Sequence, residues 1–156
     1  MFGSNNLEEV YDLNITEGNI KFLEHINKAK INLLIADAGN GINSAKNLIH
    51  SSSKNSKDWV NVFTFYYDSL HNYSEALLCF KQIECLNSQA LFAVLCLKFP
   101  NLELDWNFLE RMRNKRETLI NLDKLNYNDW KLLELQLGLY ISILKEELEK
   151  NYSFTL

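Results

Sequence analysis

Apolar and polar residues alternate along most of this chain with the period of an amphipathic α-helix. From residue 18 onward, apolar residues recur at spacings of three and four, which places them on one face of a helix. The residues before that are polar and acidic with only scattered apolar side chains. The pattern therefore predicts a polar N-terminal arm at residues 1–16 and a helical bundle at residues 17–152.

Breaks in the pattern divide the N-terminal part of the bundle into two helices. The first helix is expected to end at Gly39 and Gly41, because glycine readily adopts the left-handed conformation of a helix C-terminus. A short helix over residues 44–49 would follow, and a polar linker at residues 51–55 would end it. The apolar stripe of the first helix would consist of Phe22, Ile26, Ala29, Leu33 and Ala36.

The remainder of the chain predicts four further helices. A long helix should begin near residues 56–58 and be central, since apolar residues cover much of its surface. A helix at residues 90–99 is apolar nearly all round and should end before Pro100. The last two are expected at residues 105–121 and 127–150, where Asn126 and Asp129 resemble a capping box for the second. The stripe of the central helix would be Val60, Phe63, Tyr67, Leu70, Ser74 and Leu77.

Composition supports an all-α fold. The chain has only 5 glycines and 1 proline, too few for the frequent tight turns of an all-β protein. Its hydrophobic content of 47% is too high for a disordered chain, and 156 residues suit one domain. We expect a single-domain helical bundle of about five to six helices with an up-and-down core.

Charge and cysteine spacing exclude several classes of function. A formal net charge of -4 argues against a sequence-independent grip on duplex DNA. The 3 cysteines lack metal-ligand spacing, so we expect reduced, buried thiols, no metal site and no cofactor. The sequence contains neither a long uncharged apolar segment nor a basic-then-apolar leader. We therefore expect a cytoplasmic protein that does not enter a membrane.

A cluster of basic residues at 111–116 is the most informative departure from the helical pattern. A helical wheel of about 100° per residue places Arg116 inside the apolar arc and Arg113 at its edge. Glu117 and Asn121 follow along the same side. A guanidinium group on an apolar face is costly unless it is paired and hydrogen-bonded. The other polar residues of the segment should face solvent: Arg111, Asn114 and Lys115.

Three roles for Arg116 stay open at this stage. It could pair with Glu117 or with an acid on a neighbouring helix, or it could lie at a subunit interface. It could also line a cleft for phosphate or an RNA backbone, which suits its planar donors. Tyr67 and His71 are one helical turn apart and share a face. Such a pair can take part in acid–base chemistry, although a structural histidine is the alternative.

From the central helix onward, the chain resembles the HEPN superfamily of small helical domains. Residues 65–71 are similar to the family's tyrosine pair followed by a histidine, and Asp129–Trp130 is similar to the start of its last long helix. When the chain is aligned on Trp130, the family's arginine corresponds to Arg116, the next motif residue to Glu117, and the motif tyrosine or histidine to Asn121. The literal Arg-Asn pair at residues 113–114 gives a second register, which places Thr118 in that last position. The helical wheel favours the first register.

The resemblance implies a binding protein with an eroded catalytic motif. Ribonuclease members of the family use the arginine, a polar residue and the histidine at a dimer cleft. Neither Asn121 nor Thr118 can act as a base near neutral pH. The resemblance therefore implies binding of nucleotide, RNA or a partner protein, such as a nucleotidyltransferase-like protein, without the standard ribonuclease activity. The expected ligand-binding residues are Tyr67, Arg113, Arg116, Glu117 and Asn121.

Three further expectations remain to be tested. A homodimer is expected, because the sixth helix is too apolar to be covered on one side by a small bundle. One alternative function is a metal-independent ribonuclease toxin of a toxin–antitoxin pair, with Arg116 and His71 as candidate catalytic residues. The other is a structural helical adaptor that binds no ligand.

Overall fold

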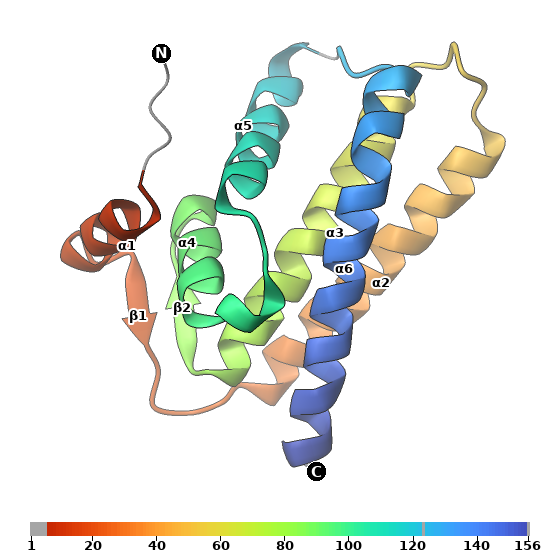
Figure 1. Cartoon of the computed structure of the whole chain (residues 1–156). Coiled ribbons are helices and arrows are strands. Elements are labelled where there is room, and N and C mark those ends of the chain that lie inside the picture. The colour runs from red at the N-terminus through yellow and green to blue at the C-terminus, as the bar shows by residue number, and fades with distance from the viewer. Residues whose placement is uncertain (1–5, 123, 156) are drawn as a thin grey trace.

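Helix α3 lies at the centre of six described helices, and the expected all-α single-domain bundle is confirmed (Figure 1). The computed structural model describes residues 6–122 and 124–155, without the side chains of residues 119–122 and 153–155. The elements are α1 (Leu7–Thr16), β1 (Ile20–Phe22), α2 (Lys28–Ser51), α3 (Trp59–Phe80), β2 (Ile83–Cys85), α4 (Ser88–Lys98), the 3-10 turn η1 (Pro100–Leu102), α5 (Trp106–Leu122) and α6 (Tyr127–Thr155).

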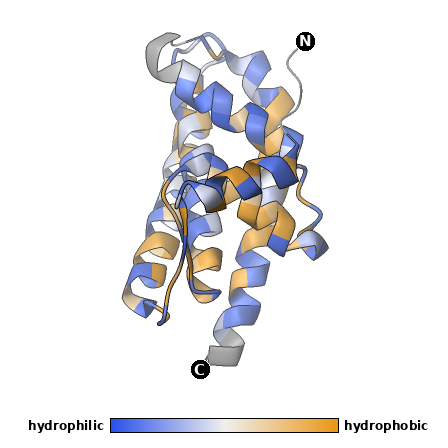
Figure 2. Ribbon diagram, turned by 90° about the vertical axis from the view of Figure 1, so that its left-hand side faces the viewer, coloured by the Kyte–Doolittle hydropathy of each residue, from blue (hydrophilic) through white to orange (hydrophobic). Residues whose placement is uncertain are grey.

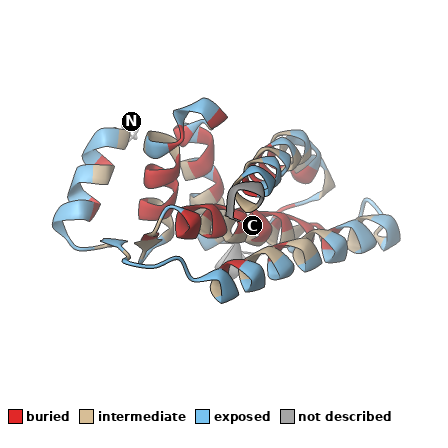
Figure 3. Ribbon diagram, turned by 90° about the horizontal axis from the view of Figure 1, so that it is seen from below, coloured by how far each residue is buried: buried red, intermediate tan, exposed pale blue. Residues whose placement is uncertain are grey.

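The central position of α3 follows from its apolar coverage. Its predicted stripe is buried except for Val60, which is partly buried, and Tyr66 and Tyr73 are buried as well. The helix packs against α2 and α6, with α4 and α5 also in contact. Seen from below, the buried positions gather on α3 and α4, whereas α2 exposes its outer face (Figure 3). The core is therefore organised around α3.

Helix α2 is continuous, so the predicted helix break at Gly39 and Gly41 is wrong. Both glycines lie inside the helix, and neither has the positive φ of a helix C-terminus. Gly41 faces α3, where an added Cβ would lie 2.5 Å from Ser69 Oγ. The same Ser69 Oγ donates a hydrogen bond of 2.9 Å to the carbonyl oxygen of Ala38. The glycine thus permits a close approach of two helices.

The apolar stripe predicted for the first helix is also wrong. Its members lie on the exposed side of the chain, with Phe22 and Leu33 among the exposed large apolar residues. The predicted stripe begins at Phe22, which belongs to strand β1, whereas the helix starts only after its N-cap Asn27. The side of α2 that packs on the core carries Ile31, Leu34, Ile35, Ala38, Ile42, Ala45, Leu48 and Ile49.

The predicted N-terminal arm contains a packed helix, α1, which contacts α4. Figure 2 shows α1 toward the viewer with both apolar and polar residues. Its buried side consists of Val10 and the polar Asn14. The Asn14 Oδ1 accepts hydrogen bonds from Asn19 Nδ2 at 2.9 Å and from Asn87 Nδ2 at 3.3 Å. A hydrogen-bonded asparagine on the buried side explains why apolar periodicity did not reveal this helix.

A two-stranded antiparallel sheet connects α1 to the core. Strand β1 pairs with β2 so that Ile20 lies opposite Cys85 and Phe22 opposite Ile83. The strands span only three residues each, and they come from segments far apart in the sequence. This pairing replaces the helix start that the sequence predicted near residue 18.

The starts of the helices in the C-terminal half lie close to the predicted positions. The Asn87 side chain accepts a hydrogen bond from the Ala90 backbone and caps α4, which ends before Pro100. The capping box of α6 is reciprocal, because the Asn126 backbone donates to Asp129 at 3.0 Å and the Asp129 backbone donates to Asn126 at 2.9 Å. Helix α6 continues beyond the predicted residue 150 to Thr155.

We expect Gly41→Ala to destabilise the fold by about 1–3 kcal/mol, because the new methyl group would displace Ser69 and its hydrogen bond. The matched control is Gly138→Ala in α6, where nothing lies within 4 Å of an added Cβ. That control should stabilise the fold by about 0.5–1 kcal/mol through helix propensity. Urea unfolding measures both changes, and equal effects of the two variants would contradict the close-packing role of Gly41.

Candidate functional site

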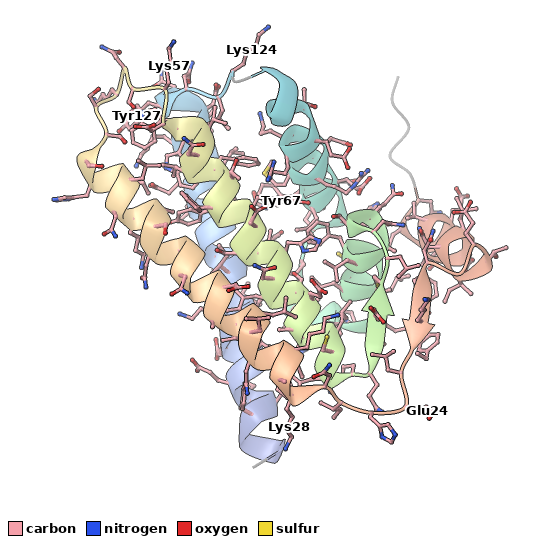
Figure 4. The ribbon with its side chains drawn as sticks, turned by 180° about the vertical axis from the view of Figure 1, so that it is seen from behind. Glu24, Lys28, Lys57, Tyr67, Lys124 and Tyr127 are labelled. Carbon is pink, nitrogen blue, oxygen red and sulfur yellow. The ribbon has the colours of Figure 1, made fainter. Side chains whose placement is uncertain are left out.

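A cleft of about 370 Å³ opens between α3 and α5, beside the first residue of α4. It brings together four of the residues that the sequence singled out, namely Tyr67, His71, Arg116 and Glu117. Figure 4 labels Tyr67 on α3, on the side where α4 and α5 lie. The other lining residues are Asp68, Asn72 and Ser88.

Arg116 pairs with an acid on a neighbouring helix, which is one of the roles left open by the sequence. Its Nε lies 3.2 Å from Asp68 Oδ1, and its Nη2 donates to Asp68 Oδ2 at 3.5 Å. The side chains of Arg116 and Asp68 are 25% and 50% exposed, so the pair lies at the rim of the cleft. Asp68 accepts hydrogen bonds from two of the five N–H donors of the guanidinium. No other described residue accepts a hydrogen bond from this guanidinium.

Arg113 belongs to a separate ion-pair network next to the cleft. Its Nε lies 2.9 Å from Glu110 Oε1 and its Nη1 lies 3.0 Å from Glu117 Oε1. Hydrogen bonding to Glu110 raises the pKa of Arg113. Arg113 does not line the cleft, so its expected part in ligand binding would be to hold Glu117 in place.

Tyr67 forms the aromatic wall of the cleft. Burial raises the pKa of Tyr67 to about 12, so its phenol is neutral at physiological pH. Its ring centroid lies 6.1 Å from that of Phe92 on α4 and 6.3 Å from that of His71. These contacts fix the ring, so the hydroxyl serves as a neutral hydrogen-bonding group.

His71 is held by neighbours on two elements. Its Nε2 lies 3.1 Å from Ser88 Oγ, and its Nδ1 lies 4.0 Å from Glu75 Oε2 one turn along α3. Burial lowers the pKa of His71 from 6.5, and this outweighs the opposing effect of Glu75. The imidazole is therefore mainly neutral at pH 7, and Ser88 engages one of its two nitrogens.

The two positions that align with the family's motif tyrosine or histidine, Asn121 and Thr118, contribute no titratable side chain to this cleft. Asn121 belongs to α5, but its side chain lies outside the described residues. Thr118 lines a different groove, and its hydroxyl donates to the Asn114 carbonyl oxygen at 2.7 Å. The described cleft thus combines a neutral imidazole, a neutral phenol and a partly engaged guanidinium with the carboxylates of Asp68 and Glu117.

Sequence reasoning missed Asp68, Asn72 and Ser88. Asp68 and Asn72 are four residues apart on α3 and alternate with Tyr67 and His71, so helical spacing could have revealed them. Ser88 comes from a different element and required the tertiary structure.

We expect the stability of the wild type to fall more steeply in acid than that of His71→Gln. The pKa of His71 is lowered in the folded state, so the unfolded chain takes up the proton more readily below 6.5. This contribution is present above that pH and is lost as the pH falls. Urea midpoints at about pH 7.5 and about pH 5.5 measure the difference. The variant His50→Gln, at an exposed residue of α2, is the matched control. Equal acid sensitivity of the wild type and His71→Gln would contradict the assignment.

The sequence matches no family model, and it has no match among curated proteins or solved structures.

Among the described residues, no three His, Cys, Asp or Glu side chains are grouped so that they could hold a metal ion. None of the helices in the described ranges is long and apolar enough to cross a membrane.

Proposed function

We propose that this protein is a HEPN-like homodimeric binding protein that holds a nucleotide or single-stranded RNA segment in the α3–α5 cleft and lacks the standard ribonuclease activity. The observation that carries the proposal is the position of Arg116. Its guanidinium lies at the rim of the cleft, and a half-exposed carboxylate engages only two of its donors. A phosphate group could use the others.

A phosphate could also replace Asp68 as the partner of Arg116. The planar guanidinium of arginine matches the oxygens of a phosphate in a bidentate arrangement. A displaced Asp68 would return to water at small cost, since exposed ion pairs contribute only about 0–1 kcal/mol. Tyr67, Asn72 and Ser88 then supply neutral polar groups for a sugar or base. A volume of about 370 Å³ is within the range of small-ligand pockets.

The same geometry supports binding over cleavage. Cleavage of RNA by attack of a ribose hydroxyl needs a base within hydrogen-bonding distance of that hydroxyl. Neither Thr118 nor Asn121 has a side chain that titrates near neutral pH. The ribonuclease alternative therefore depends on His71, one of whose nitrogens is engaged by Ser88.

An exposed leucine stripe on α6 supports the homodimer. Leu132, Leu135 and Leu139 are 83%, 85% and 55% exposed, and their spacing places them along one side of the helix. A contiguous exposed apolar stripe is typical of an interaction surface. A second copy of the chain, placed around a two-fold axis, would cover this stripe with the same residues.

We expect Leu135→Asp to convert a dimer into a folded monomer, because a charge at the centre of an apolar interface is left without a partner. Light scattering at tens of micromolar protein measures the mass. Leu33→Asp, at an exposed leucine of α2, is the matched control and should remain dimeric. A monomeric wild type at this concentration would contradict the homodimer.

We expect Arg116→Ala to abolish binding of ATP and of a short fluorescein-labelled oligoribonucleotide, with a stability loss below about 1 kcal/mol. Asp68→Asn should bind at least as well as the wild type, because a competing carboxylate is removed. Arg111→Ala, on another side of α5, is the control for loss of positive charge. Fluorescence anisotropy measures ligand binding, and urea unfolding measures the stability loss.

Two outcomes would contradict the proposed function. One is a stability loss of about 3–5 kcal/mol in Arg116→Ala, with no stabilisation of the wild type or of the variant by ligand. This result would mean that Arg116 forms a structural ion pair and does not bind a ligand. Cleavage of the oligoribonucleotide that His71→Ala abolishes would support the ribonuclease alternative.

A further inference from the structure

A second groove, of about 620 Å³, lies between α5 and α6 on a different side of α5 from the nucleotide cleft. Figure 1 shows α5 and α6 nearest to each other toward the segment that joins them and further apart at the other end of α5. The α5 wall consists of Phe108, Arg111, Met112, Asn114, Lys115 and Thr118. The α6 wall consists of Asp129, Leu132, Leu133 and Gln136.

The α5 wall carries two basic side chains without acidic partners among the described residues. Arg111 and Lys115 are one helical turn apart, and no described carboxylate lies within ion-pair distance of either. The two other arginines of this helix, Arg113 and Arg116, are both paired with acids. Asp129 is the acid in the groove, and its carboxylate accepts a hydrogen bond from the Asn126 backbone. The groove is therefore locally basic on a chain whose formal net charge is -4.

The α6 wall carries two leucines between Asp129 and Gln136. Leu132 is exposed and Leu133 is partly buried, and Leu132 is also the end of the leucine stripe nearest the groove. From Phe108 to Thr118 the α5 wall extends for about 15 Å, the length of about three helical turns. A helix of that length with acidic residues on one side and leucine-like residues on the other is complementary to these two walls.

A nucleic acid fits this groove less well than a peptide. Bases bind single-strand sites by stacking on accessible aromatic rings. The aromatic residue of the groove is Phe108, which is buried, and the guanidinium of Arg111 lies 5.7 Å from its ring centroid. The groove thus offers charge and apolar surface but no free stacking surface within the described residues.

We propose that the α5–α6 groove binds an acidic amphipathic helix of a partner protein. Carboxylates of the partner helix contact Arg111 and Lys115, and its apolar residues pack on Leu133, which lies outside the leucine stripe proposed for the homodimer. Opposite charge then sets the orientation and the association rate, while the leucine contacts supply the buried apolar area. This site does not depend on the nucleotide proposed for the α3–α5 cleft.

The test uses a fluorescein-labelled designed peptide of about three to four helical turns, with leucines on one side and glutamates on the other. The full-length protein should bind it in fluorescence anisotropy. The double variant Arg111→Glu with Lys115→Glu should weaken binding by about tenfold or more, since two opposite-charge contacts become repulsive. Lys28→Glu with Lys46→Glu, at two exposed residues of α2, makes the same charge change away from the groove and should bind like the wild type. Circular dichroism confirms that both variants are folded.

Other outcomes would overturn the proposal. These are no binding of the glutamate peptide, equal binding of a glutamine version of it, or equal effects of the two double variants. Loss of the homodimer in light scattering for the groove variant alone would identify a second copy as the occupant. Displacement of the peptide by an oligoribonucleotide, in a protein that also carries Arg116→Ala, would identify the groove as a nucleic-acid site. Because Arg116→Ala removes binding at the α3–α5 cleft, this last experiment tests the groove independently of the cleft.

Discussion

The need to bury helix α3 on nearly every side determines the arrangement of the other elements. Small residues of α2 allow one side of α3 to approach closely, with Gly41 against Ser69. Helix α6 covers another side through Trp130, whose ring centroid lies 4.7 Å from that of Tyr66. Helix α4 contributes Phe92, which contacts Tyr67. Because apolar burial is the main force that stabilises a fold, these contacts place α2, α4 and α6 relative to α3.

One side of α3 carries polar groups, and there the packing opens into the cleft. Asp68, His71 and Asn72 lie on this side, where α5 approaches with Arg116. A fully buried ion pair would cost desolvation free energy, whereas a pair at a rim keeps part of its hydration. The same rim leaves the guanidinium accessible to a ligand. Stability and accessibility are therefore compatible at Arg116.

Helix α5 separates its charges between two sides. Arg113 and Arg116 are paired with acids, whereas Arg111 and Lys115 lie in the α5–α6 groove without acidic partners among the described residues. Burial also reduces the acid–base capacity of the cleft, because it raises the pKa of Tyr67 and lowers the pKa of His71. The two proposed sites thus differ in chemistry as well as in place.

The sequence alone determined what depends on residues close together in the chain. The capping box at Asn126 with Asp129, and the buried stripe of α3, follow from local hydrogen bonding and helical period. For the site, helical spacing brought Tyr67 and His71 together and marked Arg116 as unusual. These signals are local because a cap or a helical turn spans only about four residues.

The tertiary structure decided everything that depends on partners far apart in the chain. Gly41 looked like a helix end, but its role comes from Ser69 on another helix. Apolar periodicity does not reveal α1, because the buried side of this helix carries Asn14, whose side chain is hydrogen-bonded to Asn87. Strand β1 forms only because it pairs with β2. Asp68 is 48 residues from Arg116, so no periodicity could pair them. The residue pattern of a segment shows which secondary structure that segment prefers. Which distant residues it contacts depends on how the segments pack around the core.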